Sequence, residues 1–161
     1  MFQVRFHGRG GQGVVTAAEP IRTHEPVTEP DALIIQDPTL LHQADLFAGL
    51  GRDGYMLVNS TRGFGELGLD EFVQGFHPDR LLVVPASSLA MAHLGRPLPG
   101  AALLGGFAAL TGVVSLDSVL AAIGEKFTGP VADGNAAAAR AAFDFVTDER
   151  ATLAGKVATD A

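Results

Sequence analysis

The sequence predicts an α/β fold, a three-layer, Rossmann-like arrangement with a mostly parallel sheet between helices on both faces. Short strand-like segments alternate with segments of helical periodicity, which is the pattern of parallel α/β sheets. A glycine-rich loop also joins the first strand directly to a helix, as in nucleotide-binding domains. The 161 residues suit a single domain over residues 1–161, and a hydrophobic content of 47% excludes a disordered chain.

Four segments are predicted strands. The first, residues 2–7, alternates apolar and polar side chains. The other three are short unbroken apolar runs, typical of strands covered on both faces, at residues 32–35, 55–58 and 81–84. Three prolines within residues 20–30 exclude a regular helix or a central strand between the first two.

Helical segments are predicted after the first, second and fourth strands. One is expected to begin with residues 14–19, and a second begins after Asp37, which caps it, with Pro38 at its first position. The apolar side of the second contains Leu40, Leu41, Ala44, Phe47 and Ala48. Later helices are predicted at residues 87–94, 101–111, 115–127 and 134–146, the last capped by Asp133 and followed by a charged C-terminal tail over residues 147–161.

Composition excludes several classes of protein. The net charge of -7 disfavours nucleic acid as a partner, because phosphate binding needs a basic face. Without cysteine the chain cannot form a disulfide scaffold, a zinc ribbon or an iron–sulfur cluster of its own. The uncharged residues 101–116 are too few for a membrane span, which needs about 20. No signal-peptide pattern is present, so we expect a cytoplasmic protein without a membrane partner.

The glycine loop is the first candidate binding site. Gly8, Gly10 and Gly13 fit the pattern G-x-G-x-x-G. Glycines let the backbone approach a ligand, and the first turn of the following helix offers N–H groups and a positive dipole end to an anion. Arg9 could add a charge-assisted contact. The alternative is a tight turn that serves only helix–strand packing.

Residues 59–62 form the second candidate, at the predicted carboxyl end of a strand, where ligands bind in open α/β sheets. They offer an amide, two hydroxyls and a guanidinium; the alternative is a cap or turn cluster. None of the five histidines has a second ligand at metal spacing, and no catalytic set such as Ser-His-Asp is evident. The residues by themselves therefore indicate a binding module without a catalytic or metal site.

The block from Phe6 to Glu19, FHGRGGQGVVTAAE, resembles the opening of the gamma subunit of the 2-oxoacid:ferredoxin (2-oxoacid:acceptor) oxidoreductases, the pyruvate:ferredoxin oxidoreductase family. Three later blocks match in order: residues 37–41, residues 58–62, and the stretch from Leu94 to Gly112 that contains LGRPLP, LGGF and TG. The resemblance extends from Met1 to about Val146.

The resemblance implies a gamma-type α/β domain that helps to bind coenzyme A within a complex that oxidatively decarboxylates a 2-oxoacid to acyl-CoA. Thiamine diphosphate, magnesium and [4Fe-4S] clusters would lie in partner subunits of the alpha, beta and delta types, and ferredoxin or another acceptor would take the electrons. The implied ligand residues are Gly8, Arg9, Gly10, Gly11, Gln12 and Gly13, flanked by Asn59, Ser60, Thr61 and Arg62.

The chain departs from the family pattern in three places. Pro85 precedes Ala86-Ser87 where an acid is common, and Gly100 stands where asparagine is frequent. The family also continues its first helix past Glu19, with a further loop and strand, whereas here Pro20 follows directly. A helix from about Gln12 would then be roughly 12 Å long, too short for a crossover. We therefore expect that a segment, and some ligand contacts with it, is missing between Glu19 and Pro20.

Two other functions remain open. An NAD-dependent Rossmann dehydrogenase would need an acid about 20 residues after the loop, at the end of a second strand; Glu29 and Asp31 have that spacing but lie in the proline-rich stretch. A purely structural subunit would need no ligand. For the complex, pyruvate is the expected substrate, and phenylglyoxylate or another 2-oxoacid is an alternative.

Overall fold

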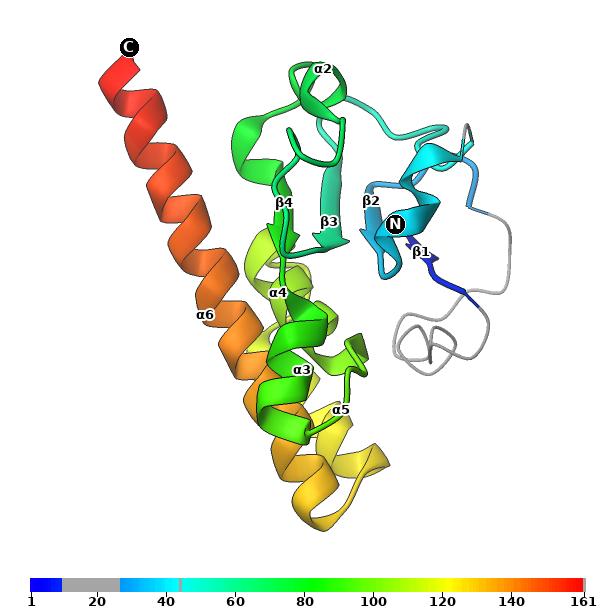
Figure 1. Ribbon diagram of the computed structural model, residues 1–161, viewed down its shortest axis with the longest axis vertical. Helices are drawn as coiled ribbons and strands as arrows, with labels where there is room; N and C mark the ends of the chain where they lie inside the picture. Colours follow the sequence, from blue (N-terminus) through cyan, green and yellow to red (C-terminus); the bar gives the residue numbers. More distant parts are fainter. Residues whose placement is uncertain (10–26, 44, 161) are drawn as a thin grey trace.

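The computed structural model describes residues 1–9, 27–43 and 45–160. Its centre is a four-stranded sheet of β1 (Val4–His7), β2 (Ala32–Ile35), β3 (Tyr55–Asn59) and β4 (Leu81–Val84). All neighbouring strands are parallel, and their order in the sheet is β1-β2-β3-β4 (Figure 1). This arrangement confirms the predicted α/β fold.

Short elements connect the strands: the 3₁₀ helices η1 (Pro38–His42) and η2 (Pro78–Arg80) and the single turn α2 (Asp70–Val73). Four helices then follow β4, namely α3 (Ala86–Leu94), α4 (Gly100–Thr111), α5 (Leu116–Lys126) and α6 (Gly129–Asp160). No helix among the described residues is both long and apolar enough to cross a membrane.

Side chains on the two faces of the sheet form separate cores. Ile34, Leu57 and Val84 pack on one face against α4 and α6, with Phe107 of α4 buried between them. Leu33, Met56 and their neighbours face the other way, against η1, α2 and the turns beside them. Because strand order follows chain order, the β2–β3 and β3–β4 connections both cover this second face. Helical elements therefore cover both faces.

The helix predicted after Asp37 is mostly wrong. Asp37 does cap η1, by accepting a hydrogen bond from the Thr39 backbone N–H, but η1 ends at His42 and residues 45–49 form turns. The carbonyl oxygens of Leu46 and Ala48 accept hydrogen bonds from the Arg5 guanidinium at 2.9 and 2.7 Å. Arg5 thus satisfies carbonyls that a continuous helix would have paired with its own N–H groups.

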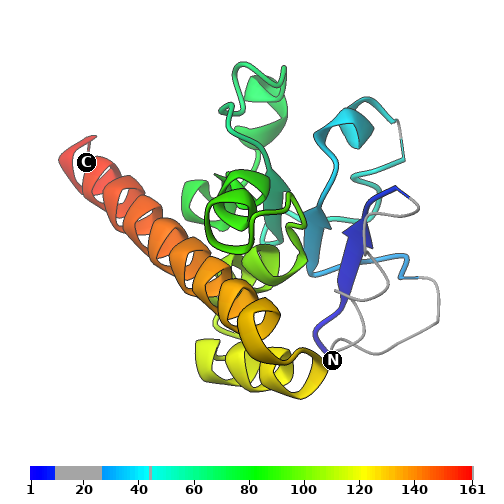
Figure 2. The same ribbon diagram turned by 60° about the horizontal axis from the view of Figure 1, so that its bottom comes forward.

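Helix α6 is far longer than the predicted helix over residues 134–146. It begins at Gly129, so Asp133 lies inside it rather than capping it, and it continues to Asp160. Most of the predicted charged tail is therefore helical, and its end projects away from the sheet (Figures 1 and 2). Arg150 anchors this half by donating to the Ala109 carbonyl at 3.0 Å and pairing with Asp79 at 3.4 Å.

Candidate functional site

The carboxyl ends of the four parallel strands meet at one edge of the sheet, which we call the carboxyl edge. Gly8 and Arg9 leave β1 there, Gln36 and Asp37 leave β2, and residues 60–62 leave β3. Backbone hydrogen bonds join these ends, from Gln36 N–H to His7 O at 2.8 Å and from Ser60 N–H to Val84 O at 3.1 Å. The two predicted candidate regions therefore lie at the same edge.

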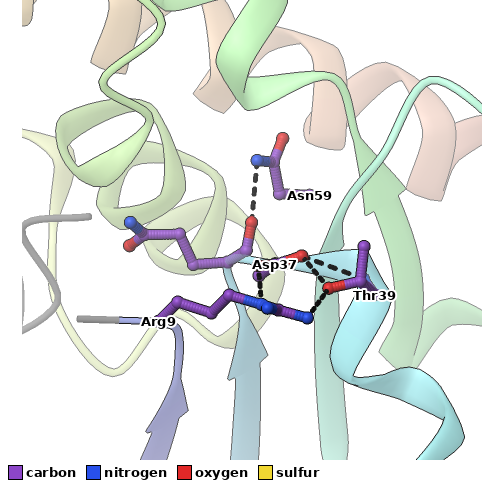
Figure 3. Close-up of polar contacts among 5 residues, drawn as sticks. Arg9, Asp37, Thr39 and Asn59 are labelled. Carbon is purple, nitrogen blue, oxygen red and sulfur yellow. Dashed lines mark hydrogen bonds and ion pairs between the residues drawn. The ribbon is translucent and has the colours of Figure 1, made fainter. Parts of the chain in front are cut away.

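Arg9 is held by two groups from the start of η1 (Figure 3). Its Nε lies 2.8 Å from Asp37 Oδ2, and its Nη2 donates to Thr39 Oγ1 at 2.8 Å. Asp37 Oδ1 in turn accepts from the Thr39 backbone N–H and hydroxyl at 3.0 and 2.7 Å. The Arg9 side chain is 60% exposed and that of Asp37 only 10%, so a ligand would meet the arginine and not the carboxylate behind it.

Asn59 faces the protein, not the solvent at this edge. Its Nδ2 donates to the Gln36 carbonyl at 2.9 Å and to Ser87 Oγ at 2.8 Å, and its Oδ1 accepts from Ser87 N–H at 3.1 Å. The residue is 7% exposed. These bonds favour the structural reading of Asn59, as a buried link between β2, β3 and α3, over direct ligand contact.

The three residues after Asn59 turn outward. Ser60 Oγ accepts from the Arg62 backbone N–H at 3.0 Å, which closes a tight turn. Thr61 and Arg62 are exposed. Within the described ranges the Arg62 guanidinium makes no hydrogen bond or ion pair. Arg62 is therefore a cation that can pair with an anionic ligand without first leaving a protein partner.

His7 stands at the end of β1, beside Gly8. Arg5 Nε donates to His7 Nε2 at 3.1 Å, which makes this nitrogen an acceptor. Burial lowers the pKa of His7 below its ordinary value of 6.5, and the positive charge of Arg5 lowers it further. The imidazole is thus held neutral, with its proton on Nδ1.

The remaining predicted ligand residues, Gly10, Gly11, Gln12 and Gly13, lie outside the described residues, as do the predicted helix at residues 14–19 and the junction of Glu19 with Pro20. The sequence reasoning also missed participants. The sequence predicts a helix start and a family match at Asp37 and Thr39 but assigns them no part in the site, although an Asp-Pro-Thr run directly after a buried strand places a carboxylate at the carboxyl edge. Nothing in the sequence singled out Ser87 as the partner of Asn59.

The acids considered for an NAD site lie at the opposite edge. Asp31 precedes β2, and its carboxylate accepts from the Gln3 backbone N–H at 2.7 Å. Glu29 is further upstream still. The acid that does follow β2, Asp37, is engaged by Arg9 and Thr39. The described residues therefore offer no available carboxylate where an NAD ribose would need one.

A separate apolar groove of about 470 Å³ runs along β4 between α6 and the segment around α2. Phe64, Val73, Phe76 and Leu153 line it, and Glu149 is its single charged residue.

Metal ligands are also lacking: in the part of the chain that the structure describes, no three His, Cys, Asp or Glu side chains are grouped to hold an ion. The carboxyl edge remains the best candidate site because two arginines with exposed side chains, Arg9 and Arg62, both lie there.

Comparison with known proteins identifies the family. Residues 17–145 match the family model described as pyruvate ferredoxin/flavodoxin oxidoreductase. The common gamma subunit of the pyruvate/ketoisovalerate oxidoreductases of Pyrococcus abyssi is 34% identical over 181 residues, covering 89% of this chain and 96% of that protein. Pyruvate synthase subunit PorC of Methanothermobacter marburgensis is 33% identical, with 89% and 97% covered.

Solved structures agree in fold. The crystal structure of pyruvate oxidoreductase subunit PORC from Thermotoga maritima has a TM-score of 0.75 and 28% identity, covering 89% of this chain and 95% of that one. A keto/oxoacid ferredoxin oxidoreductase gamma subunit from Geobacter sulfurreducens has a TM-score of 0.64 at 20% identity, with 92% and 99% covered, which shows the fold alone.

The alignment lengths also bear on the expected missing segment. The 181-residue alignment to the Pyrococcus abyssi protein uses 89% of this chain's 161 residues, so about 38 aligned positions have no residue here. This chain is therefore shorter than the relative within the aligned region. The family match covers most of the chain in spite of it, and the chain belongs to the pyruvate ferredoxin/flavodoxin oxidoreductase family, as its sequence resemblance indicated.

Proposed function

We propose that this chain is the gamma-type subunit of a thiamine diphosphate-dependent 2-oxoacid:acceptor oxidoreductase complex and that its carboxyl edge binds coenzyme A. The complex would decarboxylate a 2-oxoacid, pass the electrons to ferredoxin or another acceptor, and release an acyl-CoA. The observation that carries the assignment is that Gly8 and Arg9 lie at the same sheet edge as the exposed Thr61 and Arg62, in a chain of this family.

Coenzyme A fits the chemistry of this edge. Its diphosphate and 3′-phosphate need cations and backbone N–H groups. Arg62 supplies an exposed guanidinium after β3, and Arg9 presents a second after β1. Gly10–Gly13, outside the described residues, would supply the N–H groups expected from the sequence. Asn59 would act indirectly, by fixing the base of the turn from which Arg62 projects.

The other cofactors are assigned to partner subunits. Iron–sulfur clusters need cysteine thiolates, and the sequence contains no cysteine. Among the described residues no three His, Cys, Asp or Glu side chains are grouped to hold a metal ion, so we place magnesium and thiamine diphosphate in a partner subunit as well. Bound in a partner, thiamine diphosphate would stabilise the carbanion that remains when CO₂ leaves the 2-oxoacid. This chain would hold coenzyme A, which accepts the acyl group.

Pyruvate is the proposed substrate, because the names of the relatives include pyruvate synthase and pyruvate/ketoisovalerate oxidoreductase. The test is to purify the complex through a tag on this chain and to measure acceptor reduction with pyruvate, 2-oxoisovalerate, 2-oxoglutarate and phenylglyoxylate, with and without coenzyme A. We expect alpha, beta and delta-type subunits to co-purify and turnover to depend on coenzyme A. A chain that purifies alone, or turnover that requires NAD in place of coenzyme A, would overturn the proposal.

A further inference from the structure

Two side chains at the start of η1, from its N-cap Asp37 and from Thr39, fix the Arg9 guanidinium. Asp37 Oδ2 engages Nε, Thr39 Oγ1 engages Nη2, and Asp37 Oδ1 binds Thr39 through its N–H and hydroxyl. The contacts form a closed ring, so neither partner can rotate without breaking a second bond. A guanidinium gripped along its Nε–Nη2 edge has a defined plane and direction.

The frame that makes this grip is itself rigid. Pro38 lies between the two gripping residues and restricts the backbone at the start of η1. The next two side chains, Leu40 and Leu41, are buried in the core beneath the sheet. Asp37 is nearly covered, and Arg9 and Thr39 both contact its carboxylate. The Asp37 carboxylate is therefore the fixed member of the pair, and it sets the position of the Arg9 side chain.

We propose that Asp37 and Thr39 are positioning residues that hold the Arg9 guanidinium in the orientation that binds a ligand phosphate. The inference rests on the proposed coenzyme A site. An arginine that is already ordered loses little rotamer freedom when a phosphate binds, whereas a mobile one must be ordered at that moment. Asp37 also neutralises part of the positive charge of Arg9. Its contribution to phosphate binding therefore comes from the orientation of the guanidinium and not from charge.

Binding of coenzyme A to the full chain, measured by isothermal titration, tests this coupling. Arg9→Ala is expected to weaken binding about tenfold or more through loss of a charge-assisted hydrogen bond. Thr39→Val and Asp37→Ala are each expected to weaken it about threefold to tenfold. In the Arg9→Ala background the same two substitutions are expected to have no further effect, because residues that act through one partner are not additive. Thr39→Ser, which keeps the hydroxyl, is expected to bind as the wild type does.

Two variants separate an effect on coenzyme A binding from a loss of folding. Thr39 is exposed, so Thr39→Val supports or rejects the proposal even if Asp37→Ala unfolds the start of η1. Asp53→Asn is the matched control, since Asp53 lies on an exposed loop before β3, at the opposite edge. Wild-type protein that binds no coenzyme A overturns the proposed function and this inference with it. Wild-type binding with additive effects of Arg9→Ala and Thr39→Val overturns the positioning role alone.

Discussion

The Asn59 side chain on β3 caps the first turn of α3 through Ser87. Its Oδ1 accepts from Ser87 N–H at 3.1 Å while its Nδ2 donates to Ser87 Oγ at 2.8 Å. The residue before α3, Pro85, has no side-chain group to cap the helix. A strand residue 28 positions upstream therefore performs the capping, and the same amide binds the carbonyl at the end of β2.

This arrangement predicts that Asn59→Ala destabilises the fold. Each of the three hydrogen bonds contributes about 1 kcal/mol, and their loss leaves buried polar groups unpaired. We expect the free energy of unfolding to fall by about 2–4 kcal/mol in urea titrations. Ser88→Ala, one residue further along α3 and exposed, is the control and is expected to change stability by less than about 0.5 kcal/mol. Equal stability of the two variants would contradict the capping role.

Helices α4 and α6 approach too closely for a side chain at Gly105. A Cβ placed there would clash with the backbone of Ala139, including its carbonyl oxygen. Although alanine favours a helix over glycine by about 1 kcal/mol, we expect Gly105→Ala to lower stability by about 1–3 kcal/mol through overpacking. Gly124→Ala in α5 meets nothing within 4 Å and is expected to stabilise. Thermal unfolding of both variants checks the opposite signs, and a stabilised Gly105→Ala would refute close packing.

The exposed Arg62 guanidinium predicts a direct electrostatic contribution to coenzyme A binding. We expect Arg62→Ala to raise the dissociation constant about tenfold or more and to weaken its dependence on salt. Arg52→Ala is the matched control, because Arg52 is an exposed arginine on the loop before β3, at the opposite edge. Equal effects of the two substitutions would mean that the overall charge of the protein, and not Arg62 in particular, attracts the ligand.

From the sequence we also expect Gly11→Val to weaken coenzyme A binding, because the valine side chain would block access of the ligand to the backbone.

The lowered pKa of His7 predicts a pH dependence of stability. Below the ordinary value of 6.5, the unfolded chain takes up a proton that the folded chain binds less readily. Stability is therefore expected to fall as the pH drops from about 6.5 toward the folded-state pKa. His7→Gln should remove this component in urea titrations between about pH 5 and 7.5, and exposed His42→Gln should retain it. The same pH dependence in both variants would show that His7 is not its source.

The strands were predictable because burial on both faces leaves unbroken apolar runs. The predicted bounds of β2 and β4 agree with the structure, and β3 is one residue longer. The prediction failed where a distant side chain decides local structure. Arg5 takes the carbonyls that would have continued the helix after η1, and a contact over 41 residues has no local signal in the sequence. Helix α6 likewise extends past Val146, where Arg150 contacts α4 and η2, and these distant contacts have no local signal either.

The position of the candidate site was predictable from the sequence. Which of its polar residues face a ligand and which bond inside the protein was not. Gly8, Arg9 and residues 60–62 do lie at one edge, since parallel strands end together. Asn59 was expected to face a ligand, yet its donors and acceptor are used inside the protein. Sequence order cannot show which polar residue at a strand end turns inward, because that depends on what the neighbouring strand and helix leave unpaired.

The junction of Glu19 with Pro20 can be examined directly in the protein. If a segment belongs there, trypsin will not release a peptide that runs from Gly10 to Arg22 with the two residues joined. Mass spectrometry of the undigested chain is expected to show a mass larger than that of the 161 residues, in keeping with the roughly 38 unmatched positions in the alignment to the Pyrococcus abyssi gamma subunit. Recovery of the joined peptide would show that the chain is continuous.

Isothermal titration of the full chain with coenzyme A and, separately, with NAD tests the central claim most directly. Our account predicts saturable binding of coenzyme A, weaker binding of the form that lacks the 3′-phosphate, and no binding of NAD, with Arg62→Ala reducing the first and Arg52→Ala leaving it unchanged. Binding of NAD in preference to coenzyme A, or the absence of any coenzyme A binding by the wild type, would contradict it.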